Sequence, residues 1–205
     1  MQALEETSVL IGAYLKGDSR AFDQLFGRYA ARLVNFVNRI IGDRDRAEDL
    51  VQEAFLRVHR HLPRFDRSKQ FSTWIYTIAS NLAKNEIRNR RRSSLLLLQP
   101  GENGGEDGGI LLQFEDSRTR PDEMYRQRYL SEVVNRCVAL LSEQHREVFV
   151  MRELEGRSYE EISTALHLPV NSIGPVLSRA KKKLQNGRVR ANSAPKSDNN
   201  ENAAS

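Results

Sequence analysis

Aromatic, amide and basic side chains lie close together between residues 64 and 92. Phe71 and Trp74 are followed by Asn81, and five of the nine residues at 84–92 are lysine or arginine. Aromatic faces stack on nucleic-acid bases, at about 1–3 kcal/mol per base, and basic side chains contact the phosphates. This combination favours a nucleic-acid partner. The alternatives are core packing for Trp74 and a solvated helix end for the basic run.

A second pattern near the C-terminal end indicates binding to duplex DNA. Two short amphipathic segments, at 158–166 and 171–184, flank a turn around His167. This is the helix-turn-helix arrangement, whose second helix can present its outer face to the major groove. Two crossed helices also occur in ordinary helical bundles, so the motif favours DNA binding without excluding a purely structural role.

An enzyme is the first competing class of protein. His59 and His61 are two residues apart, which points them to different faces of a helix and makes them a poor metal pair. Cys137 lies on an apolar helical stripe, where a cysteine is typically a core residue rather than a nucleophile. The sequence therefore predicts no catalytic residue, no metal site and no cofactor.

Helical periodicity predicts an all-α fold. Apolar residues recur at three-four spacing in the stretches 22–41, 47–58 and 74–82, and again at 130–141 and 148–154. No segment shows the alternation of a half-buried strand. The residues expected at helix ends are Asp18 or Ser19 and Gly42 for the first helix, Asp45 with Glu48 as a capping box for the second, Ser72 for the third, and Gly156 and Ser158 further on.

Composition divides the chain into two small helical domains joined by a flexible acidic linker. The chain has 205 residues, of which 39% are hydrophobic and 29% charged, as in soluble globular proteins. Residues 100–109 hold five glycines, one proline and three acids, and cannot build a core. We expect a first domain at 1–93, a linker at 94–123, a second domain at 124–187 and a disordered tail at 188–205.

The charge distribution fits a polyanionic partner. Residues 1–93 carry 17 basic and 11 acidic residues, and residues 130–190 carry 10 and 7, whereas residues 94–129 carry 4 and 7. No apolar run is long enough for a membrane helix, and the first nine residues hold no basic residue of a secretory signal. With a single cysteine, the chain is expected to be cytoplasmic, with no membrane contact of its own.

Three stretches together resemble a known family. Residues 47–58 (AEDLVQEAFLRV) and 71–81 (FSTWIYTIASN), with the arginines that follow, resemble domain two of bacterial sigma factors, and residues 152–162 (RELEGRSYEEI) resemble the opening of sigma domain four. With no other domain between them, the chain resembles the extracytoplasmic-function (ECF) group of the sigma-70 family. The resemblance covers about two thirds of the chain, at roughly 20–93 and 130–185.

The resemblance implies an initiation factor that binds core RNA polymerase, directs it to particular promoters and helps to melt them. The implied partners are the clamp helices of the largest polymerase subunit, the flap of the second-largest subunit and promoter DNA. Members of the group commonly have an anti-sigma factor, so one is expected here. The acidic linker would run toward the active-site cleft of the polymerase, or be a simple tether.

The resemblance also implies site residues. The implied residues for docking on the polymerase are Glu48, Asp49, Gln52 and Glu53. The alternative for these four residues is an ordinary solvated helix face. For recognition and melting of the minus-ten element they are Arg64, Phe65, Asp66, Lys69, Phe71, Trp74, Asn81, Lys84, Asn85 and Arg88. For the minus-thirty-five element they are Arg152, Glu160, Asn171, Ser172, Gly174, Pro175, Ser178, Arg179 and Lys182.

The recognition helix departs from the family pattern. Many members carry Gly-Thr-Val-Lys-Ser-Arg at its start, whereas residues 171–176 here are Asn-Ser-Ile-Gly-Pro-Val. If Asn171 or Ser172 caps this helix, Pro175 lies in the first turn, where backbone N–H groups have no intrahelical partner. His167 replaces the usual turn glycine and would adopt a left-handed conformation at some cost. Arg179 is the best candidate for a base contact, because its guanidinium can span two acceptors on guanine.

Two other functions remain open from the sequence. A helix-turn-helix regulator that binds duplex DNA without polymerase would explain the second domain, but would leave the Trp74 region and the acidic strip unused. A sigma-like protein with a weakened recognition helix would act mainly as a competitor for polymerase. Transcription from a promoter separates these two from a working sigma factor.

Overall fold

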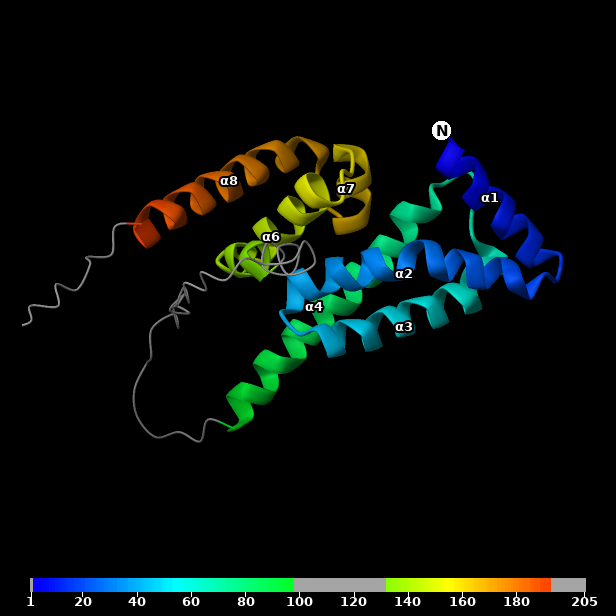
Figure 1. Cartoon of the computed structure of the whole chain (residues 1–205), viewed down its shortest axis with the longest axis horizontal. Helices are drawn as coiled ribbons and strands as arrows, with labels where there is room; N and C mark the ends of the chain where they lie inside the picture. The colour runs from blue at the N-terminus through cyan, green and yellow to red at the C-terminus, as the bar shows by residue number, and fades with distance from the viewer. Residues whose placement is uncertain (1, 98–131, 193–205) are drawn as a thin grey trace, which may run out of the picture.

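The computed structural model describes residues 2–97 and 132–192, which are almost entirely helical (Figure 1). These two ranges contain no strand, so the predicted all-α fold is confirmed. The expected linker and tail lie mostly outside these two ranges, and the domain boundaries stay predictions.

The N-terminal bundle consists of α1 (Gln2–Leu15), α2 (Ser19–Ile41), α3 (Arg44–His61), the short 3₁₀ turn η1 (Leu62–Arg64) and α4 (Phe71–Leu97). The C-terminal bundle consists of helical residues 132–139, α6 (Glu143–Phe149), the π-helical turn η2 (Val150–Leu154), α7 (Tyr159–Leu166) and α8 (Val170–Asn192).

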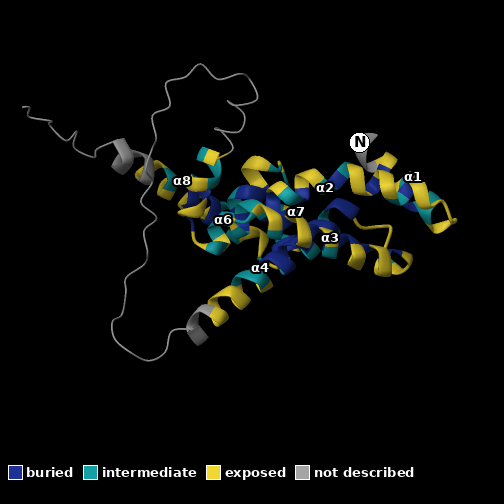
Figure 2. Cartoon of the chain, turned by 60° about the horizontal axis from the view of Figure 1, so that its bottom comes forward, coloured by how far each residue is buried: buried dark blue, intermediate teal, exposed yellow. Residues whose placement is uncertain are grey.

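The core of the N-terminal bundle lies where α2, α3 and α4 meet. Each helix buries one apolar stripe, as its three-four spacing predicts, and leaves its polar side in solvent (Figure 2). The C-terminal part of α4 projects beyond the bundle (Figure 1). The residues of this core include Leu25, Leu33, Phe36 and Ile40 of α2, Leu50, Ala54 and Val58 of α3, and Ile75, Ala79 and Leu82 of α4.

The ends of α2 follow the predicted signals. The Asp18 carboxylate accepts a hydrogen bond from the backbone N–H of Arg20, and Gly42 ends the helix in the left-handed conformation, with φ 71°. Glycine adopts this conformation without steric cost, which lets the chain reverse directly into α3.

The predicted capping box at the start of α3 is wrong. The cap is Asp43, whose carboxylate accepts from the N–H of Arg46 at 3.0 Å, and Asp45 lies inside the first turn. Asp43 also accepts from Arg90 of α4 at 2.9 Å. The bond to Arg90 adds a tertiary contact to this cap, which a local pattern does not contain.

The third helix also begins earlier than predicted. Helix α4 starts at Phe71, and the N–H of Trp74 donates to the Gln70 carbonyl at 3.2 Å. Ser72 therefore lies in the first turn and is buried at 6% exposure, rather than capping the helix. The packing of Phe71 into the core favours this earlier start.

The helix-turn-helix begins as predicted. The Ser158 hydroxyl accepts from the N–H of Glu161, and the Glu161 carboxylate accepts from the N–H of Ser158, which completes a capping box. His167 adopts the left-handed conformation at φ 56° and ψ 42°, as expected for a residue in place of the turn glycine.

The start of α8 differs from the prediction. The helix begins at Val170 rather than after an Asn171 or Ser172 cap, so that Pro175 is its sixth residue. At that position proline cannot donate to the Asn171 carbonyl. At the other end of this segment, the Ser172 N–H donates to the Pro169 carbonyl at 2.9 Å. This bond between residues three apart tightens the first turn of the helix.

The two bundles pack against each other, with α7 on α4 and α6 beside the end of α2. Buried apolar residues form one continuous cluster that runs from Leu25 and Phe36 to Ile162 and Ile173. The described parts of the chain therefore share one core.

Substitution of His167 tests the cost of the left-handed turn. His167→Gly should raise the free energy of unfolding by about 0.5–1 kcal/mol, because relief of side-chain strain exceeds the added chain entropy of glycine. His167→Val should lower it, because a β-branched residue fits this conformation worst. Urea unfolding followed by circular dichroism measures both, and equal stability of all three proteins would contradict the interpretation.

Candidate nucleic-acid interface

A cleft of 920 Å³ opens between the N-terminal bundle and α7. Six of the ten residues predicted for the minus-ten element line it: Arg64, Phe65, Asp66, Lys69, Trp74 and Asn81. The opposite wall is formed by α7 and the residue that follows it, with the side chains of Glu160, Glu161, Thr164 and His167. The cleft thus brings together predicted residues from η1, from the loop that follows it and from α4.

Trp74 lies at the floor of this cleft in an aromatic group. Its ring stacks on Phe65 with 4.7 Å between centroids and 24° between planes, and meets the edge of Phe71 at 5.9 Å. Phe71 is only 4% exposed, whereas Trp74 is half-buried. Phe71 therefore supports the other two rings from below, and Phe65 and Trp74 are the rings that border the cleft.

The loop between η1 and α4 is held in place by its own polar groups. The Asp66 carboxylate accepts from the N–H and the hydroxyl of Ser68 at 3.0 and 2.7 Å, and these bonds lower the pKa of Asp66. Arg67 reaches back to the Ser8 carbonyl of α1 at 3.4 Å. Between this loop and α1 lies a smaller hollow of 120 Å³, which Lys69 also borders.

The cleft also includes residues that the sequence analysis missed. Thr73 and Thr77 share one face of α4 with Asn81, and Arg57 and His61 border the cleft from α3. The four-residue spacing of Thr73, Thr77 and Asn81 was the available signal, since residues four apart lie on one helix face.

Beyond the cleft, the polar side chains of α4 differ in their surroundings. Lys84 pairs with Glu147 of α6 at 3.3 Å, while Asn85 accepts from Arg88 at 2.8 Å on the exposed surface. Arg90 is held between Glu86 and Asp43, at 2.8 and 2.9 Å. Arg90 therefore joins α4 to the start of α3, rather than lying free for phosphates.

The acidic strip lies on the outer face of α3. Glu48, Asp49 and Gln52 are exposed and Glu53 is half-buried, opposite the buried stripe of the same helix. Arg44, Arg46 and Arg57 of α3 pair with the three carboxylates, at 3.2 Å for Glu48, 3.5 Å for Asp49 and 2.5 Å for Glu53. Exposed pairs of this kind contribute about 0–1 kcal/mol and exchange readily for other partners. Leu56, 59% exposed on the same helix, was missed by the sequence analysis.

On α8 the predicted residues divide by exposure. Asn171, Pro175, Ser178, Arg179 and Lys182 are exposed, whereas Ser172 and Gly174 are partly buried. A Cβ atom at Gly174 would lie 3.8 Å from the Tyr159 ring, an ordinary contact, so packing does not require glycine there.

The supporting residues lie on η2 and α7. The Arg152 guanidinium covers the Tyr159 ring at 5.2 Å and donates to the Arg157 carbonyl at 2.7 Å. Glu160 is exposed and faces the cleft rather than the outer surface of α8. Of the predicted minus-thirty-five residues, it alone among those described lines the cleft.

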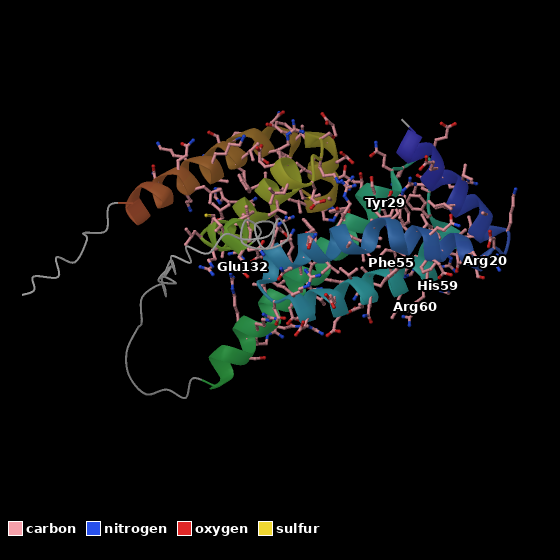
Figure 3. The ribbon with its side chains drawn as sticks, in the orientation of Figure 1. Arg20, Tyr29, Phe55, His59, Arg60 and Glu132 are labelled. Carbon is pink, nitrogen blue, oxygen red and sulfur yellow. The ribbon has the colours of Figure 1, made fainter. Side chains whose placement is uncertain are left out.

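The two histidines considered as a metal pair do not act together. His59 lies at the α1 end of the bundle (Figure 3). Its ring packs against Tyr14 and Phe22, with 5.8 and 5.4 Å between centroids. His61 borders the cleft instead. Within residues 2–97 and 132–192 there is no group of three or more potential metal ligands, and no helix is long and apolar enough to cross a membrane.

Comparison with known proteins identifies the family. Residues 25–93 match the family described as Sigma-70 region 2, and residues 131–184 match Sigma-70, region 4. The ECF RNA polymerase sigma-E factor of Escherichia coli K12 is 33% identical over 180 residues, which are 87% of this chain and 92% of that protein.

Two solved structures share the fold at lower sequence identity. CnrH in complex with the cytosolic domain of CnrY is 21% identical, with a TM-score of 0.65, and the match covers 92% of this chain and 99% of that one. The sigma factor RpoE of Bartonella quintana, in complex with the anti-sigma factor NepR, is 21% identical, with a TM-score of 0.60, and the match covers 80% and 94%. With both sigma-70 regions matched and a relative aligned over most of its length, the chain belongs to the ECF group of the sigma-70 family of RNA polymerase sigma factors.

Proposed function

We propose that three surfaces of this chain bind the polymerase and the two promoter elements. As a member of the ECF group, the chain binds core RNA polymerase, directs it to promoters and assists their melting. The observation that carries the residue assignments is the cleft, where an aromatic pair, amides and basic groups meet. The experiment that tests the function is promoter-dependent transcription with core polymerase.

The first surface is the acidic strip of α3, which docks on the clamp helices of the largest polymerase subunit. It is supported by the exposure of Glu48, Asp49 and Gln52 in the presence of the C-terminal bundle. Complementary charge gives fast, register-specific association. Leu56 adds apolar area to the same contact.

The second surface is the cleft, which takes one strand of the minus-ten element as the duplex opens. Extruding a base costs a few kcal/mol, which stacking on aromatic rings can offset. Trp74 with Phe65 is the stacking platform, Asn81 with Thr73 and Thr77 contacts base edges, and Lys69, Lys84 and Arg88 contact phosphates. The aromatic geometry and the shared face of α4 support these roles.

The third surface is the outer face of α8, which enters the major groove of the minus-thirty-five element. Ser178, Arg179 and Lys182 are exposed there, and Asn171 and Pro175 stand at the start of the helix. The polymerase contact of this bundle is the flap of the second-largest subunit.

The remaining features follow from this role. The chain performs no catalysis itself, because the polymerase carries out the chemistry. It acts in the bacterial cytoplasm, at the nucleoid when bound to polymerase. The similarity to a sigma factor solved with its anti-sigma factor supports an anti-sigma partner for this chain.

Reversal of one charge tests the docking surface. Asp49→Arg should weaken binding to core polymerase by about tenfold or more, because it places like charges opposite each other. Asp23→Arg is the matched control, since Asp23 is also exposed, on α2, and lies off the strip. Equilibrium binding to labelled core polymerase measures the affinity of both variants. Equal affinities would show that the acidic strip is not the docking surface.

Truncation of Trp74 tests the melting surface. Trp74→Ala should reduce open-complex formation by the value of one stacked base, about 1–3 kcal/mol, while binding to core polymerase stays near the parent value. Trp74→Phe, which keeps an aromatic face, should retain most of the activity. Permanganate footprinting of the melted region gives the first quantity; a loss confined to polymerase binding would argue against the assignment.

Two substitutions on α8 separate base contact from phosphate contact. Arg179→Ala should cost about 1–3 kcal/mol on the preferred minus-thirty-five sequence and relax specificity at one position. Lys182→Ala should weaken binding to all sequences alike and reduce the salt dependence by about one charge. Transcription from promoter variants at several salt concentrations distinguishes them; uniform loss in both variants would remove Arg179 from base recognition.

A further inference from the structure

Helix α8 carries a proline inside its second turn. The helix begins at Val170, and Pro175 is its sixth residue. In an α-helix the N–H of each residue donates to the carbonyl four positions earlier, and proline has no N–H. The carbonyl of Asn171 therefore lacks the partner that any other residue type at position 175 would supply. The ring of Pro175 also crowds this carbonyl, which favours an outward tilt away from the helix axis.

The carbonyl lies on the outer face of α8. Four exposed residues follow the three-four spacing of one helix face: Asn171, Pro175, Ser178 and Lys182. The opposite stripe is buried in the bundle and consists of Ile173, Val176, Leu177 and Ala180. The Asn171 carbonyl therefore belongs to the surface that enters the major groove in the proposed function.

The donors next to this carbonyl are engaged elsewhere. The Ser172 hydroxyl donates to the Pro169 carbonyl at 2.7 Å, and the Ser172 N–H donates to the same carbonyl at 2.9 Å. None of the side-chain hydrogen bonds within residues 2–97 and 132–192 ends on the Asn171 carbonyl. An exposed carbonyl of this kind takes its hydrogen bond from water or from a bound ligand.

The start of α8 presents an acceptor where the family pattern has basic side chains. Residues 174–176 are Gly, Pro and Val, so none of these three side chains can donate a hydrogen bond. Guanine presents two acceptors in the major groove and is read by a donor such as arginine or lysine. This part of the helix instead combines a main-chain acceptor with the exposed ring of Pro175.

Gly174 makes this arrangement possible. A residue before proline is disfavoured in the helical conformation, because its Cβ and its N–H clash with the proline ring. Glycine has no Cβ, which removes part of that clash. A Cβ at Gly174 would make only an ordinary contact of 3.8 Å with the Tyr159 ring, so packing on α7 does not explain the glycine. Gly174 and Pro175 therefore act together to keep the Asn171 carbonyl out of the helical hydrogen bonds.

We propose that the Asn171 carbonyl, freed by Pro175, accepts a hydrogen bond from the exocyclic amine of a base in the minus-thirty-five element. In the major groove this amine is N4 of cytosine or N6 of adenine, whereas guanine and thymine present acceptors. The start of α8 thus selects cytosine or adenine at one position of one strand. This inference rests on the proposed role of α8.

Two changes at position 175 separate the carbonyl from the ring. Pro175→Ala restores an N–H, which returns the Asn171 carbonyl to the helical hydrogen bonds. N-methylalanine at position 175 has neither N–H nor ring, so it keeps the carbonyl free. The full-length chain with this residue is made by ligating a synthetic segment that begins at Cys137, the single cysteine, to an expressed segment of residues 1–136. Thermal unfolding confirms that each protein is folded.

Pro169→Ala is the matched control. Pro169 is also exposed, and it precedes α8, so the N–H that this change restores has no carbonyl of α8 to pair with. A change in helix stability alone alters binding to all DNA sequences alike. The readout is therefore the preference among bases at single positions rather than the total affinity.

The first measurement is transcription with core polymerase from promoters selected by the parent from random-sequence DNA, with all four bases then placed at each minus-thirty-five position. The parent, Pro169→Ala and the N-methylalanine protein should prefer cytosine or adenine at one position. Pro175→Ala should lose about fivefold of that preference, the value of one hydrogen bond, and keep the preferences elsewhere. Equal preferences in Pro175→Ala and the parent would overturn the inference. Loss in the N-methylalanine protein as well would assign the preference to the ring and also overturn it.

The second measurement removes the amine from the DNA instead of the carbonyl from the helix. Purine in place of adenine, or 2-pyrimidinone in place of cytosine, lacks the exocyclic amine. This replacement should weaken promoter binding by the parent with core polymerase about fivefold more than binding by Pro175→Ala. Equal losses for the two proteins would show that the amine does not contact the carbonyl.

Transcription by the parent distinguishes failure of the inference from failure of the proposed function. If the parent gives no promoter-dependent transcript with core polymerase, the proposed function is wrong, and the inference is wrong with it. If the parent gives transcripts whose base preferences do not depend on Pro175, the function stands and only the inference is wrong.

Discussion

Helix α4 contacts the core of the N-terminal bundle, the cleft and the C-terminal bundle at once, and the rest of the structure depends on how its surface is divided among them. Ile75, Ala79 and Leu82 face the core of the N-terminal bundle, while Thr73, Trp74 and Asn81 border the cleft. Tyr76 and Ser80 reach the carboxylates of the C-terminal bundle. Because a helix repeats every 3.6 residues, these sets lie on adjacent sides of one helix.

The contact between the bundles combines apolar burial with buried polar bonds. The continuous apolar cluster holds the surfaces together, and the carboxylates set their register. Burial raises the pKa of Glu147, because desolvation of the charged form outweighs the attraction of Lys84. Burial, and then the nearby Glu155 carboxylate, raises the pKa of Tyr76. A buried ionic contact gains little net free energy, since desolvation offsets the Coulombic attraction.

Helix α3 is joined to α4 by charge as well as by apolar packing. Arg46 donates twice to Glu86 of α4, at 3.1 and 2.9 Å, and Arg90 joins Glu86 to the cap residue Asp43. The hydrogen bond from Arg46 holds the pKa of Glu86 below its ordinary value. These ionic contacts therefore fix the acidic strip of α3 relative to α4.

The sequence by itself predicted the helices other than α1, the helix ends at Gly42 and Ser158 and the helix-turn-helix, because these depend on residues three or four positions apart. It left the cap of α2 open between Asp18 and Ser19, and it indicated the family through longer motifs. It also predicted six of the minus-ten residues that meet in the cleft, but not Thr73, Thr77 or the residues of α3 that border it. Only the tertiary structure decided that Asp43 rather than Asp45 caps α3, that α8 begins at Val170, and that α7 forms the opposite wall of the cleft. The bonds of Ser80 to Glu147 and of Tyr76 to Glu155 span 67 and 79 residues. A periodic sequence pattern cannot predict such pairs, because they form only when one folded bundle packs on the other.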